Sequence, residues 1–371
     1  MKKLLHITLL LLSFTAFGQH STELKGFVKN IAADTLILAK SYQDLRYNGT
    51  EIPVAKSKEF RLVLKHQYVE EYVFVYKSEL KNGMWRPITF FPNGNTITFE
   101  LYPIQEYAKN KISGDTLGQQ KKRYEEALGE KFSKTADEIY GELYQLEKDG
   151  REVATVKLRL DSLNKKILAF QYDYFLQDTS IVGLDEYVIL LENAKQMLIS
   201  PEIFKPYQTY YVKLKPKHPL TERAQNLYIA LTTVKVGQHY VDIALEDRND
   251  IAVKLSELLQ KETFTILDLW SPWCGPCIAK SRKVKENYSK LSKNVQIIGV
   301  VGGIDRKEKA EKAIDRFAYP WKNYLEVANK NKIWEKYGIS NAGGAQFLIN
   351  QKGEIVAINP TIEDLLKIIQ E

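Results

Sequence analysis

Residues 264–277 read FTILDLWSPWCGPC, and this stretch decides the fold of the C-terminal part of the chain. Its first half is a short, mainly apolar run that includes Asp268, and runs of this length and composition are typical of buried β-strands. Its second half holds Cys274 and Cys277 on either side of a Gly-Pro pair. Because proline is tolerated in the first turn of a helix, the stretch predicts a strand that passes into a helix at the cysteines.

Cys274 is the predicted nucleophile. At the start of a helix its sulfur would lie next to unpaired backbone N–H groups and the positive end of the helix dipole. Both favour the thiolate and lower the thiol pKa from its usual value of about 8.5. A thiolate can attack a substrate disulfide, and Cys277 can then resolve the mixed disulfide that results. We therefore expect the two cysteines to form a redox-active disulfide.

Asp268 is the predicted catalytic base. Cys277 must lose its proton when it resolves the mixed disulfide, and Asp268 precedes the cysteines on the strand that leads to them. A carboxylate in so apolar a strand is costly to bury, which argues for a role. We expect Asp268 to be buried and to accept the proton of Cys277 through a water. The alternative is an exposed aspartate at the edge of a sheet.

Other uses of a Cys-x-x-Cys motif find less support. A zinc site needs further ligands, and the chain has no third cysteine. Covalent haem attachment needs a histidine after the second cysteine, where Ile278 stands. A peroxidatic cysteine would not be expected to have a Gly-Pro-Cys partner. We expect no metal and no cofactor; a purely structural disulfide stays open, although so short a loop adds little stability.

Strand and helix patterns alternate through residues 234–371. Strands are expected at Val241–Leu245, 264–270, Asn294–Val301, Ala345–Ile349 and Ile355–Ile358. Helices are expected at Ile251–Leu259, Cys274–Leu291, Lys307–Phe317 and Ile362–Ile369. This order predicts an α/β domain with a mixed sheet and helices on both faces.

The chain of 371 residues is long enough for two or three domains. Residues 19–102 contain short β-branched and aromatic runs between turn signals such as Asn48-Gly49, which predict a small all-β sandwich. Residues 103–233 have helical spacing, and two amphipathic stretches separated at Asp149-Gly150 predict an antiparallel helical hairpin. We interpret this helical region as a packing spacer.

Residues 1–18 predict a signal peptide. A charged start precedes an apolar run that ends at Ala16-Phe17-Gly18. A retained membrane anchor is the alternative, although the run is shorter than the roughly 20 residues that a span needs. The formal charge of +7 comes from basic residues scattered among acidic ones, so no nucleic-acid partner is expected.

Residues 264–277 resemble the active-site strand and motif of thioredoxins. Residues 236–245 and 347–353 are similar to the exported TlpA/ResA branch, and the resemblance covers about the last third of the chain. The β-rich start resembles that of exported thioredoxin-like proteins with an N-terminal domain of unknown function. The resemblance implies a thioredoxin-like fold, activity on protein thiols and disulfides, a periplasmic location and a membrane thiol electron donor of the DsbD type.

The chain departs from that family at two places. Members carry a cis-proline in the loop that faces the cysteines, where this chain has Gly343, Gly344 and Ala345. Glycines would leave this loop looser, and we expect these three residues and Trp273 to contact the substrate. Members also have Glu and Pro three and five residues after the second cysteine, where Lys280 and Arg282 stand here. We expect both to lie on a solvated face.

The sequence favours an exported thiol-disulfide oxidoreductase that reduces protein disulfides, because its Gly-Pro pair matches that of thioredoxin, a reducing couple near −270 mV. Two alternatives stay open. One is an exported binding or scaffold protein on a degenerate thioredoxin fold. The other is a disulfide oxidase or isomerase on the same fold.

Overall fold

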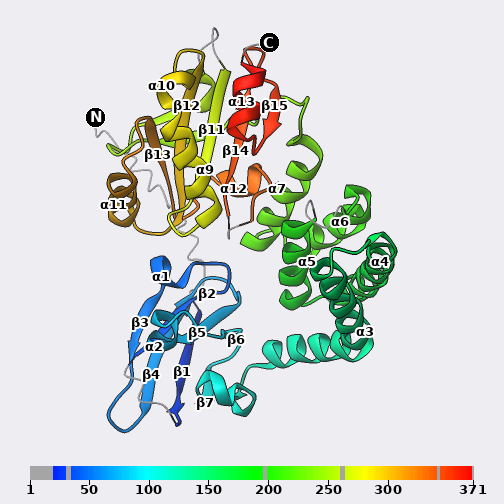
Figure 1. Cartoon of the computed structure of the whole chain (residues 1–371). Helices are drawn as coiled ribbons and strands as arrows, with labels where there is room; N and C mark the ends of the chain where they lie inside the picture. The colour runs from blue at the N-terminus through cyan, green and yellow to red at the C-terminus, as the bar shows by residue number, and fades with distance from the viewer. Residues whose placement is uncertain (1–19, 31–34, 195–198, 260–263, 341–342, 370–371) are drawn as a thin grey trace, which may run out of the picture.

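The computed structural model describes residues 20–30, 35–194, 199–259, 264–340 and 343–369. Three parts follow one another along the chain: a β-sandwich, a group of helices and an α/β domain (Figure 1). The predicted signal peptide, residues 1–18, lies outside the described residues. None of the described helices is long and apolar enough to cross a bilayer.

The N-terminal part is a sandwich of two four-stranded sheets. One sheet has the order β4 (Glu59–His66), β1 (His20–Val28), β7 (Thr96–Leu101), β8 (Lys111–Ser113). The other has the order β3 (Thr50–Pro53), β2 (Thr35–Lys40), β5 (Tyr72–Tyr76), β6 (Ile88–Phe90). Phe99 of the first sheet meets Phe74 and Phe90 of the second, with ring centroids 5.2 and 5.1 Å apart. The predicted sandwich is confirmed.

The sandwich extends past the boundary predicted at residue 102. Strand β8 pairs antiparallel with β7 and completes the first sheet. It follows the 3₁₀ helix η1 (Ile104–Lys109) and is three residues long, too short to show an alternating pattern in the sequence. Two short helices, α1 (Leu45–Asn48) and α2 (Lys77–Lys81), connect strands of the sandwich.

The middle of the chain is helical, as predicted. α3 (Thr116–Lys148) and α4 (Ala154–Gln177) form the expected antiparallel hairpin around the break at residues 149–153. They are followed by α5 (Ile181–Asn193), η2 (Pro201–Phe204), α6 (Lys205–Leu214) and α7 (Pro219–Thr233). Buried aromatic side chains, including Phe175, Tyr187 and Tyr207, hold these helices together.

The C-terminal part contains a seven-stranded mixed sheet. Its order is β10 (Ala252–Lys254), β9 (Ala244–Glu246), β13 (Lys322–Val327), β12 (Val295–Ile304), β11 (Phe264–Trp270), β14 (Ala345–Ile349), β15 (Ile355–Ile358). The three central strands β11, β12 and β13 are parallel, β14 runs antiparallel to β11, and β15 runs antiparallel to β14. The predicted α/β fold is confirmed.

Alternate residues of β11 point to opposite sides of the sheet, so both faces carry apolar side chains. Helices cover both faces. They are α8 (Leu255–Leu258), α9 (Gly275–Glu286), α10 (Tyr288–Leu291), α11 (Lys307–Phe317), α12 (Ile333–Lys336) and α13 (Ile362–Ile368). Ile266 and Trp270 pack with residues of α9, α11 and α13. Leu267 and Leu269 pack with residues of α12 and of α7 from the middle part.

Several expected elements differ in the structure. The strand expected at Val241–Leu245 is β9, which begins at Ala244, and the first half of the helix expected at Ile251–Leu259 is strand β10, paired with β9. The expected helix Cys274–Leu291 is two helices, α9 and α10, that meet at Asn287. Strand β13 and helix α12 were not predicted. All of these elements are short or broken, so their local periodicity is weak. For the strands, pairing across the sheet outweighs that periodicity.

Candidate active site

Cys274 and Cys277 are joined by a disulfide at the start of α9. Cys274 is the N-cap of this helix, and its Sγ accepts a hydrogen bond from the backbone N–H of Cys277 at 3.2 Å. Pro276 stands in the first turn, where its missing N–H costs nothing. The sulfur of Cys274 therefore lies at the positive end of the helix dipole, as the sequence predicts.

Asp268 is buried beneath the cysteines on the central strand β11, with 1% of its surface exposed. Its carboxylate accepts hydrogen bonds from Ser281 Oγ at 2.7 Å and from Gln346 Nε2 at 3.2 Å. Burial raises the pKa of Asp268 to about 6, although these hydrogen bonds act in the opposite direction. The expected burial is confirmed, and the alternative of an edge-exposed aspartate is wrong.

A cavity of about 200 Å³ joins Asp268 to the cysteines. Its lining includes Cys274, Cys277 and Lys280 from the α9 side. Such a space is large enough to hold water, and the carboxylate at its wall offers that water a hydrogen-bond partner. The geometry thus permits proton exchange between Cys277 and Asp268 through a water, which is the route expected from the sequence.

Lys280 does not lie on a solvated face, contrary to the expectation. It is half-buried and lines the same cavity as Asp268. Burial lowers the pKa of Lys280, while the charge of Asp268 raises it. Arg282 is exposed, as expected. The signal that could have placed Lys280 is its position three residues after Cys277, on the same face of α9.

Ser281 and Gln346 are site residues that the sequence analysis missed. Ser281 is fully buried on α9, four residues after Cys277, and Gln346 lies on β14 opposite Asp268. Helical spacing could have indicated Ser281. Gln346 could not be found in this way, because only the β11–β14 pairing brings it to Asp268.

The loop predicted to face the cysteines does so at Gly344. A Cβ atom built there would lie 2.1 Å from the carbonyl oxygen of Leu269 and 3.0 Å from Sγ of Cys277. Glycine therefore lets the backbone approach the disulfide directly. The carbonyl of Gly343 accepts a hydrogen bond from Trp334 Nε1 at 2.8 Å, and Ala345 pairs with Leu269 at the start of β14.

Trp273 connects the active site with the N-terminal sandwich. Its ring lies against Gly303, where a Cβ would be 2.5 Å from the indole. On its other side is Tyr47 of α1, with ring centroids 4.8 Å apart. Asn48 holds this contact, since it donates to the carbonyl of Gly303 and accepts from the N–H of Asp305, both at 2.9 Å. No site residue in the sandwich was predicted from the sequence.

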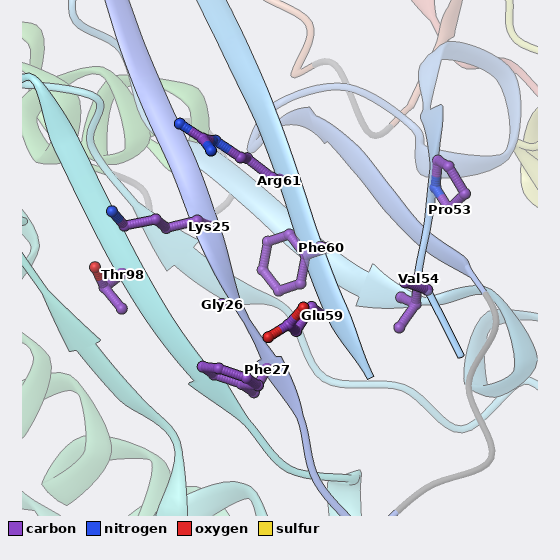
Figure 2. A pocket seen from close by; sticks show the side chains of 10 residues that line it. Lys25, Gly26, Phe27, Pro53, Val54, Glu59, Phe60, Arg61 and Thr98 are labelled. Atoms are coloured by element: carbon purple, nitrogen blue, oxygen red, sulfur yellow. The ribbon is translucent and has the colours of Figure 1, made fainter. Parts of the chain in front are cut away.

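A second, larger hollow of about 610 Å³ belongs to the sandwich alone. Figure 2 shows Phe27, Phe60 and Val54 around it, with Lys25 and Arg61 on the neighbouring strands. Its lining contains no cysteine. The residues for thiol chemistry are therefore those at the start of α9.

Comparison with known proteins agrees with the C-terminal fold. Residues 236–358 match the AhpC/TSA family. This match and the strand order show that the C-terminal part is thioredoxin-like. No curated protein matches the chain.

Similar solved structures come from several bacteria. The thioredoxin domain of a thiol-disulfide oxidoreductase from Bacteroides vulgatus is 22% identical with a TM-score of 0.33, over 37% of this chain and 97% of that one. A thiol:disulfide interchange protein from Bacteroides sp. is 24% identical with a TM-score of 0.33, over 37% and 89%. A putative thiol:disulfide interchange protein DsbE from Chlorobium tepidum is 22% identical with a TM-score of 0.30, over 37% and 95%.

Proposed function

We propose that this chain is a thiol-disulfide oxidoreductase that reduces protein disulfides through Cys274 and Cys277. One observation carries the proposal: Cys274 caps α9, and both cysteines share a cavity with a buried carboxylate. The helix start favours the thiolate of Cys274, and the carboxylate can take the proton that Cys277 must lose.

The reaction begins from the reduced pair. The thiolate of Cys274 attacks one sulfur of the substrate disulfide, the substrate S–S bond breaks, and its other sulfur leaves as a thiolate. Cys277 then attacks Sγ of Cys274 and releases the second substrate sulfur. Two electrons pass from the cysteine pair to the substrate, whose two thiolates take up protons. The enzyme is left with the Cys274–Cys277 disulfide that the structure holds.

Asp268 acts in the second step. Its pKa of about 6 leaves it mostly ionised at neutral pH, so it can accept the proton of Cys277 through a water in the cavity. The positive charge of Lys280 at the same cavity lowers the pKa of Asp268 and keeps the base ionised. Ser281 and Gln346 orient the carboxylate through their hydrogen bonds.

The compartment and the electron source belong to the same proposal. The N-terminal sequence predicts export, and an exported reductase needs a donor that returns two electrons to its disulfide. A membrane thiol carrier of the DsbD type, acting by the same exchange, would supply them in the periplasm. The family resemblance supports this part of the proposal.

The test is the redox equilibrium of the cysteine pair against dithiothreitol and glutathione buffers, read by thiol alkylation. We expect a reversible couple near −270 mV, as in thioredoxin. A potential above about −150 mV would instead indicate an oxidase, since DsbA lies near −120 mV. A pair that never exchanges would contradict the proposal and favour the binding-protein alternative.

A further inference from the structure

A cleft of about 490 Å³ runs between the sandwich, the helical part and the active site. Trp273 forms one end of its lining, next to Cys274 in the chain. Trp85 of the sandwich and Ile189 of α5 line it as well, and each exposes 41% of its surface. In Figure 1 the sandwich lies below the C-terminal sheet with the helical part to its right, and α1 lies at the end of the sandwich that faces the C-terminal part. The cleft has the volume of an ordinary ligand site.

The cleft reaches the residue before the reactive cysteine, Trp273, whereas Cys274 itself lines the smaller cavity at Asp268. Its lining near the active site is Trp273, which contacts Tyr47 in a tilted arrangement, together with Leu45 and Arg46 of α1. Lys309 donates a hydrogen bond to the carbonyl of Tyr47, which fixes α1 against the C-terminal part. A chain lying in this cleft would therefore contact Trp273, the residue before Cys274.

The charges along the cleft favour a cation. Four carboxylates line it, against two guanidinium groups. Both guanidinium groups are already paired within the chain: Arg46 with Asp44 at 2.6 Å, and Arg223 with Glu192.

The remaining two carboxylates share a single cation. Glu71 and Asp185 lie 2.8 and 3.5 Å from Nζ of Lys121, and Glu186 lies 3.0 Å from the same nitrogen. When all three are ionised, these carboxylates outnumber the one ammonium, and charges act strongly where water is largely excluded. Burial raises the pKa of Asp185, and an arriving cation would favour its ionised form.

We propose that this cleft binds the polypeptide segment next to the substrate cysteine, and that it prefers an apolar side chain accompanied by lysine or arginine. Exposed Trp85 and Ile189 supply apolar contact area, and the carboxylates supply the charge preference. Small anionic disulfides gain nothing from such a lining. The inference rests on the proposed function and adds its substrate class.

The test compares three disulfides in single-turnover oxidation of the reduced full-length chain, followed by tryptophan fluorescence. Two are peptides with leucine and either lysine or glutamate beside one cysteine, each joined by a disulfide to 2-mercaptoethanol. The third is bis(2-hydroxyethyl) disulfide, which is too small to reach the cleft. We expect the lysine peptide to react about tenfold faster than the glutamate peptide.

Variants of the cleft separate docking from chemistry. Trp85→Ala should lower the rate with the lysine peptide about tenfold, and Ile189→Arg should remove the preference for lysine over glutamate. Neither should change the rate with the small disulfide. Met84→Ala and Ile229→Arg are matched controls, because both residues are exposed and neither lines the cleft.

The outcomes distinguish this inference from the proposed function. Equal rates for the two peptides, or equal losses in Trp85→Ala and Met84→Ala, would overturn the docking site while the oxidoreductase stands. A reduced chain that reacts with none of the three disulfides would overturn the proposed function itself.

Discussion

The cavity at Asp268 and the cleft at Trp273 differ in how they are built. The cavity takes its reactive groups from the C-terminal part alone, and Asp268, Cys274, Cys277 and Lys280 lie within thirteen consecutive residues. The cleft takes its lining from all three parts of the chain, from Ser41 to Trp273. Thiol chemistry can therefore be encoded in one short segment. A surface that selects a protein substrate instead needs distant segments that folding brings together.

Removal of the nucleophile should have the largest effect. It should abolish disulfide exchange at the cavity without changing peptide binding in the cleft. Cys274→Ser is expected to lower disulfide exchange at least about a thousandfold, because Cys277, the other cysteine, does not hold the N-cap position that favours the thiolate. Binding of a reduced lysine peptide, measured by calorimetry, should be unchanged. Cys277→Ser is the companion variant and should accumulate a mixed disulfide, visible by mass spectrometry. Retained exchange in Cys274→Ser would contradict its role.

Replacement of the buried base should have the next largest effect. Asp268→Asn is expected to slow the resolving step about a hundredfold, because a general base contributes at least about this much. In the unmodified chain this step should accelerate as pH rises through about 6, where Asp268 ionises, and the variant should lack that dependence. Stopped-flow measurement between pH 5 and 8 tests this, and an unchanged profile would exclude Asp268 as the base.

The same substitution should stabilise the oxidised chain. The pKa of Asp268 rises from 3.8 unfolded to about 6 folded, so the folded state binds more protons in this window and loses stability as pH rises through it. Asp268→Asn should therefore raise the free energy of unfolding at pH 7 by about 2–3 kcal/mol and give no such gain below pH 4. Urea unfolding at both pH values measures it, with exposed Asp137→Asn as the control.

Glycine substitutions test the approach of the backbone to the disulfide. Gly344→Ala places a Cβ against Leu269 and Cys277, and should cost about 1–3 kcal/mol of unfolding free energy. Gly343→Ala is the matched control, because a Cβ there meets open space. Thermal unfolding of both variants in the oxidised form measures the difference. Equal stabilities would show that the loop can move away from the cysteines.

Loss of the lysine at the cavity should have the smallest effect. Lys280→Gln removes a charge that lowers the pKa of Asp268, so the inflection of the resolving step should move above pH 6. The rate at pH 7 should fall a few-fold at most. Arg282→Gln, at an exposed position of the same helix, should leave the profile unchanged. If both variants behave alike, Lys280 has no specific effect on Asp268.

The sequence predicted the elements whose pattern is long or whose residues are chemically constrained. The sandwich strands, the α3–α4 hairpin and strand β11 all have such patterns, and burial of Asp268 followed from its apolar neighbours. Short elements were less predictable. Strand β13 is buried between β9 and β12, and nothing in its six residues indicates that pairing. Lys280 was placed in solvent because a charge on a helix usually lies there.

The sequence by itself determined the cysteine pair, its position at a helix start and the α/β order around it, because these depend on residues close together in the chain. Only the tertiary structure decided that Gln346 meets Asp268, that Gly344 touches Cys277 and that Tyr47 of the sandwich contacts Trp273. Tyr47 and Trp273 are far apart in the chain, and no local pattern records a contact of that range. Such contacts form when separate apolar surfaces are buried against each other, which is a property of the whole fold.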